Sequence, residues 1–365
     1  MLTSEGCRAR QARLLAAMEA NGYDLLLTGN YRTAYYFTGS LTAAEAPVIF
    51  AIASNGDSLL VTSSKHAAVA GEVRELETYS IRRTIEQPWR DAAALLDDWL
   101  VRRQSASSIA VERAATPHML CTDPAAHDAT RLLLRLRKRK EEDEIAEIRQ
   151  ALHYCAVAYD AARQAIAPRR TELDVYNAMY SAIVRDAGSS IVFAGDFACG
   201  ARGIREGGPP TRREILPGDL YILDIFPAPA LYFGDTCRTF SVGAPSDRQL
   251  RAWEIVRDAV RLGESLVRPG VRARDVYAAV KDFLDGFPLT EGSFWHHAGH
   301  GIGHHGHEAP RIIPGTDDVF EVGDVITLEP GVYAEALQGG IRLEDNYVVR
   351  EHGLENLFVY PMEMY

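Results

Sequence analysis

The chain has little of what secreted, membrane-spanning or disulfide-linked proteins depend on. Its five cysteines are scattered among 365 residues and are never spaced as Cys-x-x-Cys. This argues against a disulfide framework and a cysteine zinc site, and it favours a reducing, cytoplasmic compartment. No run approaches the roughly 18 apolar residues of a membrane span. The first residues, MLTSEGCRARQARLLAAM, also lack the apolar core of a secretory signal.

The chain also has fewer basic than acidic residues. The chain has 39 Lys and Arg against 50 Asp and Glu, a formal net charge of −11. A phosphate backbone must be met by a surplus of basic side chains, so neither nucleic acid nor an anionic membrane is an expected partner. A cationic or zwitterionic small substrate suits this charge better. Short-period repeats and low-complexity tracts are absent from the sequence, which excludes a solenoid.

What is present first indicates two domains, because 365 residues exceed the usual size of one. In the first third, apolar runs such as DLLLTG and SIAVER predict strands. Asn55-Gly56, between VIFAIAS and SLLVTS, predicts a β-hairpin. Helical spacing recurs near residues 8–20, 91–103 and 124–135. We therefore expect a compact α/β domain over residues 1–137.

The run RLRKRKEEDEIAEIRQA marks the expected domain boundary near residue 138. Its basic cluster gives way to acids and then to apolar positions at helical spacing. Such a run could bind a partner, but a solvated linker that leads into a helix explains it better. Thr171 with Asp174 predicts a capping box for a second helix. Strand and turn patterns follow, interrupted by helical spacing at 247–266 and 273–285, so an α+β second domain is expected over residues 138–365.

Six of the eleven histidines fall in one segment, His296–His307, and part of it, GIGHHG, matches the GxGxxG of a dinucleotide site. That site needs a strand before the glycines and a helix after them. Here no apolar strand precedes, and Pro310 and Pro314 block a helix. The pair His307-Glu308 is followed by Ala-Pro-Arg, so an HExxH zinc helix is excluded too. A metal site and a polar loop remain.

Two strand-turn-strand patterns carry acids, and each of these acids is expected inside an otherwise apolar strand. Asp224 and Asp235 lie in LYILDIFPAPALYFGDTCRTFSV, and Glu329 and Glu344 lie in DVITLEPGVYAEALQGGIRLEDNYVV. Taken singly, each acid could cap a turn, pair with an arginine or face solvent. Together with one glycine-flanked histidine they form a mainly oxygen ligand set that suits two divalent ions such as manganese, cobalt or iron. Two dications would balance four clustered carboxylates.

These segments, with HAGHGIGHHGHEAP, resemble the successive signatures of the pita-bread metallopeptidases, which include methionine aminopeptidase, prolidase, aminopeptidase P and the creatinase branch. Their order and spacing match over residues 220–346, and NYRTAYYFTG resembles the N-terminal domain of the prolidase-like branch. The resemblance implies an α/β N-terminal domain (1–137) followed by an α+β pita-bread catalytic domain (138–365). The complete ligand set argues against creatinase itself, and the separate N-terminal domain argues against methionine aminopeptidase.

The resemblance also implies the ligands of the two ions. Asp224 and Asp235 would hold one ion, and Asp235, His300, Glu329 and Glu344 the other, with Asp235 and Glu344 bridging. The ions would be manganese, cobalt, iron or zinc. A water or hydroxide between them is the implied nucleophile.

Four residues are implied to act on the substrate. Glu329 would double as the general base. His307 would hydrogen-bond the substrate carbonyl or the tetrahedral oxyanion, and His296 and Arg342 would line the substrate pocket. The predicted reaction is hydrolysis of Xaa-Pro peptide bonds, as an aminopeptidase or a dipeptidase, and a homodimer is expected.

Two positions depart from the family pattern. A substrate-contacting histidine usually stands where this chain has Gly207, and Gly207→His would then restore the contact. The strand with the first aspartate usually reads Asp-x-Gly, whereas Phe226 here would narrow or redirect the pocket. The loop before Gly207 offers Arg202, Arg205 and Glu206 instead. These changes leave open a metal enzyme of the same fold that acts on a non-peptide small molecule, by hydrolysis or elimination, and a metal-dependent binding protein.

Overall fold

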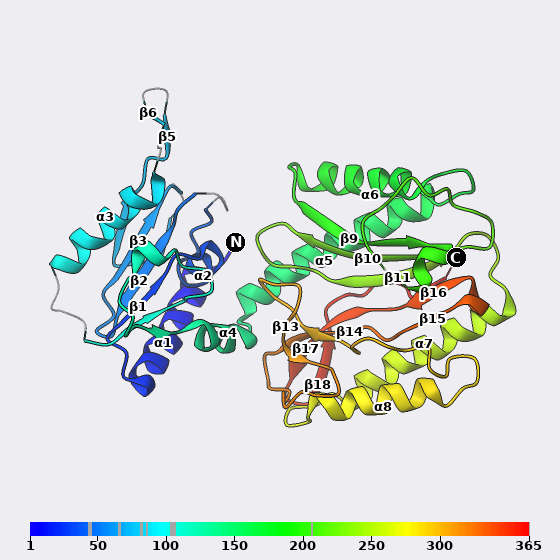
Figure 1. Ribbon diagram of the computed structural model, residues 1–365. Helices are drawn as coiled ribbons and strands as arrows, with labels where there is room; N and C mark the ends of the chain where they lie inside the picture. The colour runs from blue at the N-terminus through cyan, green and yellow to red at the C-terminus, as the bar shows by residue number, and fades with distance from the viewer. Residues whose placement is uncertain are drawn as a thin grey trace. The chain divides into compact units, whose positions relative to one another are not determined.

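The computed structural model divides the chain into two compact units, Met1–Arg137 and Lys138–Tyr365 (Figure 1). It describes residues 1–42, 46–64, 67–80, 83–84, 87–102, 107–205 and 207–364. Glu206 lies outside the described residues.

A six-stranded mixed sheet forms the centre of the first unit, in the order β4-β3-β2-β1-β7-β8. β2 and β3 pair antiparallel around Asn55-Gly56, which confirms the predicted hairpin, and β1 pairs parallel with β7. A separate two-stranded ribbon joins β5 and β6. The strands are β1 (Leu25–Thr28), β2 (Ile49–Ala53), β3 (Ser58–Thr62), β4 (Glu72–Glu75), β5 (Tyr79–Ser80), β6 (Arg83–Thr84), β7 (Ile109–Val111) and β8 (His127–Asp128).

Helices cover both faces of this sheet, because alternate residues of β1 are apolar and buried on opposite sides. Leu26 packs with Leu14 of α1, whereas Leu27 packs with Trp99 of α3. The unit contains α1 (Ser4–Asn21), α2 (Tyr31–Thr38), α3 (Pro88–Val101), the short helix η1 (His118–Leu120) and α4 (Thr130–Lys138).

The second unit contains three sheets, and the chain leaves one sheet for another and then returns to it. Their orders are β11-β10-β9, β13-β12-β14-β17-β18 and β15-β16. The strands are β9 (Val192–Cys199), β10 (Leu220–Ala228), β11 (Thr236–Ser241), β12 (His300–Gly301), β13 (Glu308–Arg311), β14 (Val325–Leu328), β15 (Gly331–Ala334), β16 (Gly339–Arg342), β17 (Asp345–Arg350) and β18 (Gly353–Asn356).

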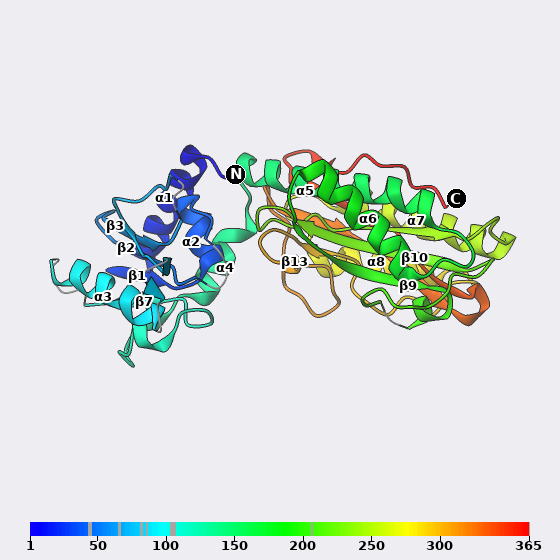
Figure 2. The ribbon, with the colours of Figure 1, turned by 90° about the horizontal axis from the view of Figure 1, so that it is seen from above.

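Two pairs of helices enclose these sheets (Figures 1 and 2). α5 (Glu142–Ala165) and α6 (Glu172–Ala187) pack against β10 and β9, while α7 (Asp247–Leu266) packs against β14, β15 and β16 and pairs with α8 (Ala273–Asp285). Two short helices, η2 (Gly200–Ile204) and η3 (Glu335–Leu337), complete the unit. A capping box of Thr171 and Asp174 opens α6, as predicted. Within the described parts of the chain, no helix is both long and apolar enough to span a bilayer.

Candidate metal centre

Two of the predicted ligands come from the β10–β11 pair. Asp224 lies within β10, where it pairs in register with Cys237 of β11. Asp235 directly precedes β11 instead of lying in it, which corrects the prediction that it sits on the returning strand. Its backbone N–H donates to Asn346 Oδ1, and Asn346 Nδ2 donates back to the Asp235 carbonyl. The side chains of Asp224 and Asp235 are both buried.

Glu329 and Glu344 lie where the chain passes from one sheet to another, not inside strands as predicted. Glu329 follows β14 and precedes the β15–β16 hairpin, and Glu344 follows that hairpin and precedes β17. Glu344 also forms an isolated bridge with Cys237 through two backbone hydrogen bonds, of 3.0 and 3.4 Å. The bridge ties the second pair of carboxylates to the sheet that carries the first pair.

His300 begins β12 between two glycines that allow close backbone approach. A Cβ at Gly299, where φ is +151°, would lie 2.1 Å from the Thr327 carbonyl oxygen, and one at Gly301 would lie 2.1 Å from the Ala309 carbonyl oxygen. His300 Nδ1 lies 3.0 Å from the Gly301 carbonyl oxygen, to which it must donate. Nε2 is therefore the nitrogen left to bind a metal.

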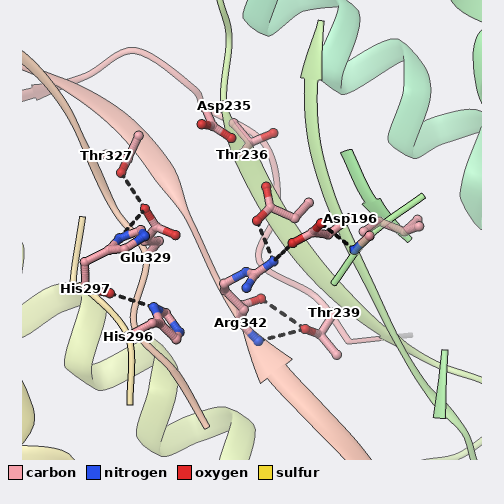
Figure 3. Close-up of polar contacts among 12 residues, drawn as sticks. Asp196, Asp235, Thr236, Thr239, His296, His297, Thr327, Glu329 and Arg342 are labelled. Carbon is pink, nitrogen blue, oxygen red and sulfur yellow. Dashed lines mark hydrogen bonds and ion pairs between the residues drawn. The ribbon is translucent and has the colours of Figure 1, made fainter. Parts of the chain in front are cut away.

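The five predicted ligands converge on one place. Figure 3 shows two of them, Asp235 and Glu329. His300 Nε2 lies 3.0 Å from Glu329 Oε1 and 3.8 Å from Asp235 Oδ2. Among the described residues, ligand atoms within 4.8 Å of one another form three sets. Two of them share Glu344, one with Asp235 and His300 and one with Asp224 and Glu329, and the third joins Glu329 to His296 and His297.

The charge of this cluster fits divalent cations. Burial and the neighbouring carboxylates raise the pKa of Asp235 and Glu344 well above their usual values. Burial also raises the pKa of Asp224 to about 6, although Arg342 opposes this. Among the described residues, Asp224 Oδ1 and both carboxylate oxygens of Glu344 have no hydrogen-bond partner. If these buried acids are all to be ionised, they need more positive charge than the neighbouring side chains supply. Their oxygen ligands, together with one imidazole, suit a hard or borderline dication.

Glu329 is held differently from the other three carboxylates. Its Oε1 accepts a hydrogen bond of 3.0 Å from the Thr327 hydroxyl and lies 3.2 Å from His297 Nδ1 (Figure 3). Burial opposes ionisation, but His297 and His300 hold the pKa of Glu329 well below its usual value. Glu329 is therefore a carboxylate at neutral pH. His297, which the sequence left unassigned, positions it.

His307 lies beside His300 at the exposed side of the cluster. The two ring centroids are 4.0 Å apart, and His307 is exposed whereas His300 is buried. The structure thus places His307 where an incoming molecule can touch it.

His296 and Arg342 are joined through Tyr333, which the sequence analysis did not single out. Arg342 Nη1 donates to the Tyr333 hydroxyl over 3.1 Å, and that hydroxyl lies 2.8 Å from His296 Nε2. His296 Nδ1 lies 2.7 Å from the His297 carbonyl oxygen and must donate to it (Figure 3). The Tyr333 hydroxyl therefore donates to His296 Nε2. Burial lowers the pKa of His296 to about 4, so this neutral form persists at pH 7.

Asp196 on β9 is the second residue that sequence reasoning missed. Arg342 Nη2 lies 2.9 Å from Asp196 Oδ2 and 2.6 Å from Asp224 Oδ2, so one guanidinium bridges both carboxylates. The backbone of Arg342 is fixed in turn by two 3.0 Å hydrogen bonds with the Thr239 hydroxyl (Figure 3). The signal that could have revealed Asp196 is its place in FAGDFA, a strand next to that of Asp224.

The space beside Gly207 is filled by Asp196. A Cβ at position 207 would lie 1.9 Å from the Asp196 carboxylate carbon, so Gly207→His could restore the family contact only by displacing the Asp196 carboxylate. Arg202 is not a substitute, because it pairs with Glu172 and donates to the Phe197 carbonyl. Arg205 is exposed.

Phe226 lies two residues beyond Asp224 on β10 and therefore on the same face of the strand. It is half-buried and pairs in register with Ala194 of β9. This position is consistent with a ring that narrows the approach to Asp224.

Two family models match the chain. The model described as metallopeptidase family M24 matches residues 146–351, and the creatinase/prolidase N-terminal domain matches residues 10–137.

Curated relatives and solved structures agree with this match. The chain is 34% identical over 238 residues to a probable dipeptidase PepE of Mycobacterium tuberculosis, covering 65% of this chain and 62% of that protein. It is 31% identical to a Xaa-Pro dipeptidase of Pyrococcus furiosus, covering 61% and 63%. The chain thus spans less than two thirds of the length of these relatives.

Two solved structures extend the likeness to both units. The prolidase of Pyrococcus horikoshii superposes with a TM-score of 0.81 at 22% identity, covering 98% of this chain and all of that one. The dipeptidase PepE of Mycobacterium ulcerans superposes with a TM-score of 0.80 at 25% identity, covering 100% and 98%. The expected fold, an α/β domain followed by a pita-bread domain, is confirmed.

Proposed function

The chain belongs to metallopeptidase family M24, and from this premise we propose that it hydrolyses Xaa-Pro peptide bonds with the help of divalent metal ions. The observation that carries the proposal is the buried cluster of four carboxylates and one imidazole, whose negative charge the chain does not balance. The relatives named Xaa-Pro dipeptidase and prolidase support a small peptide as the substrate. They favour it over the non-peptide alternative.

We propose two ions, because two of the three ligand sets share Glu344 and together contain all five predicted ligands. The residues that would hold them are Asp224, Asp235, His300, Glu329 and Glu344. When bound, the ions supply the positive charge that lowers the pKa of a nucleophilic water and polarises the scissile carbonyl. Whether they are manganese, cobalt, iron or zinc is a question for elemental analysis.

The chain's own residues prepare the reaction in three ways. Glu329, kept ionised and oriented by His297 and Thr327, accepts the proton of the attacking water. His307, exposed beside His300, donates a hydrogen bond to the oxygen that becomes negative.

The third contribution is a fixed wall of the substrate pocket. His296, Tyr333 and Arg342 form it, and their hydrogen bonds all run in one direction from the guanidinium to the imidazole. Because each of these groups already has its partner, the wall is set before the substrate arrives. We also propose residues 1–137 as the N-terminal domain and 138–365 as the catalytic domain. The homodimer and the cytoplasmic location stay predictions.

The test is a panel of Xaa-Pro dipeptides and longer Xaa-Pro-Yaa peptides, offered to protein loaded with manganese or cobalt. We expect cleavage at the Xaa-Pro bond by protein that contains about two ions per chain by elemental analysis, the number proposed from the shared ligand sets. Fully loaded protein that turns over no peptide in the panel would refute the proposal.

Glu329→Gln tests the assigned base. The amide cannot accept the proton, so kcat should fall by a factor of about 10² to 10⁴. Glu335→Gln is the matched control, because Glu335 is an exposed acid on the nearby β15–β16 connection. It should keep full activity. A Glu329→Gln protein that binds metal and retains its rate would remove Glu329 from this role.

A further inference from the structure

Asp196 stands between the buried ligand cluster and solvent. It pairs with Asp224 in the antiparallel register of β9 and β10, and such partners project from the same face of a sheet. Its side chain is 32% exposed, whereas that of Asp224 is 10% exposed. The roles proposed above do not use it.

The Asp196 carboxylate is fixed but not saturated. Oδ1 accepts a hydrogen bond of 2.6 Å from the Gly208 backbone N–H, and Oδ2 accepts one of 2.9 Å from Arg342 Nη2. Each carboxylate oxygen can accept two hydrogen bonds, so each retains a lone pair for a further donor. Because Gly208 and Arg342 both hold it, the Asp196 carboxylate is oriented before a ligand binds.

This carboxylate also occupies the space that a side chain at position 207 would need. A Cβ there would meet the Asp196 carboxylate carbon at 1.9 Å and one carboxylate oxygen at the same distance. The family pattern has a histidine at 207, and an imidazole can donate a hydrogen bond to a substrate. An ionised carboxylate can only accept, and it brings a negative charge.

The charged groups near Asp196 leave its carboxylate able to bind a further cation. Arg342 Nη2 is shared between Asp196 Oδ2, 2.9 Å away, and Asp224 Oδ2, 2.6 Å away, so the guanidinium neutralises the charge of Asp196 only in part. The Arg342 side chain is only 12% exposed and points its Nη1 toward Tyr333. A molecule that enters from solvent therefore meets the carboxylate of this pair more readily than the guanidinium.

We propose that Asp196 contacts the substrate and selects Xaa-Pro peptides whose Xaa side chain is an amine or a guanidinium. The inference rests on the proposed function and names the substrate class within it. Proline has no charged side chain, so in an Xaa-Pro dipeptide only Xaa can present an additional cation. A charge-assisted hydrogen bond then forms between that side chain and Asp196.

The experiment compares Lys-Pro with Met-Pro, which has a side chain of similar length without charge. For wild-type protein we expect kcat/KM to be about tenfold higher for Lys-Pro, a preference that weakens as salt is raised. Asp196→Asn, which keeps the shape but not the charge, should bring the ratio close to one. Glu335→Gln removes an exposed charge from the neighbouring hairpin and should leave the ratio unchanged.

Gly207→Ala provides an independent variant that keeps the charge of Asp196. Its methyl group must displace the carboxylate, so the preference for Lys-Pro should also fall. A ratio that stays at its wild-type value in both Asp196→Asn and Gly207→Ala would overturn the inference.

Binding separates this inference from the proposed reaction. Calorimetry of Lys-Pro and Met-Pro with Glu329→Gln protein, after elemental analysis has shown that its manganese content equals that of wild-type protein, measures affinity where turnover is slow. Tighter binding of Lys-Pro that disappears in the Glu329→Gln/Asp196→Asn double variant supports selection by Asp196, even if wild-type protein cleaves no peptide and the proposed function fails. Equal affinities in both proteins contradict it.

Discussion

In the second unit, the immediate surroundings of each buried acid determine whether it is ionised. Burial leaves Asp235 and Glu344 with raised pKa values, whereas His297 and His300 keep Glu329 ionised. The residue types and spacing in the sequence were enough to predict which five residues gather. They could not reveal Asp196, because its place beside Asp224 depends on how β9 pairs with β10.

Asp324, outside the cluster, predicts how stability depends on pH. Its side chain is fully buried, 3.3 Å from Lys138 Nζ, and burial raises its pKa to about 6. Because an unfolded aspartate has a pKa of about 3.9, the folded protein binds this proton more tightly. The stabilisation is therefore complete below about pH 4 and is lost as pH rises through about 6.

Asp324→Asn removes this titration. Between pH 7 and pH 5, the free energy of unfolding of wild-type protein should rise by about 1 kcal/mol relative to the variant. Urea unfolding at the two pH values measures the difference. A constant difference would show that Asp324 titrates like an unfolded aspartate, and a difference of opposite sign would show that its pKa is lowered in the folded protein; either result contradicts the prediction.

Among the helices and strands, the sequence could not predict the points at which the chain leaves one sheet and enters another. The expected second strand pair was one hairpin with Glu329 and Glu344 inside its strands. In the structure β14 pairs with β17 in one sheet, while β15 and β16 form another. Strand periodicity does not show where the chain changes sheets, since the residues on both sides remain apolar and buried.

The short β12–β13 pair offers a test of why glycines flank His300. Gly301→Ala would place a methyl group 2.1 Å from the Ala309 carbonyl oxygen, so the backbone must shift and His300 with it. We expect the manganese affinity, measured by calorimetry, to fall at least tenfold, and the free energy of unfolding to fall by about 1 to 3 kcal/mol.

Gly306→Ala is the matched control in the same segment. Apart from its two chain neighbours, no atom of the described residues lies within 4 Å of a Cβ at Gly306, and its backbone has no φ that is restricted to glycine. The variant should bind manganese like wild-type protein. Equal losses in both variants would mean that the segment is sensitive to any substitution and that close packing at Gly301 is not the cause.

For the whole molecule, the order of elements was easier to predict than some of their ends. The bounds of α7 and α8 match the helical spacing at 247–266 and 273–285. In contrast, α4 begins at Thr130, six residues later than expected, where Asp128 Oδ1 accepts the Thr130 N–H. α2 was not predicted, because its eight residues are rich in tyrosine and its helix depends on burial more than on propensity.

The division into two compact units predicts two thermal transitions in calorimetry. Manganese binds only the second unit in our proposal, so excess metal should raise one transition and leave the other unchanged. At a free concentration of one hundred times Kd the stabilisation is about 2.7 kcal/mol, which corresponds to a shift of roughly 5 to 10 °C. Asp235→Asn should abolish the shift. Two transitions that move together would contradict independent units.

The place of β9 at the edge of its sheet has a consequence for how the protein can evolve. The proposed ligands of the ions come from β10, β12 and the segments beside β11, β14 and β17, whereas Asp196 comes from β9, which pairs only with β10 among the described strands. Mutations on β9 can therefore alter which molecules are accepted without replacing any residue that holds metal, although Asp196 shares Arg342 with Asp224. After gene duplication, a few changes on this one strand would be enough to separate the preferences of two copies.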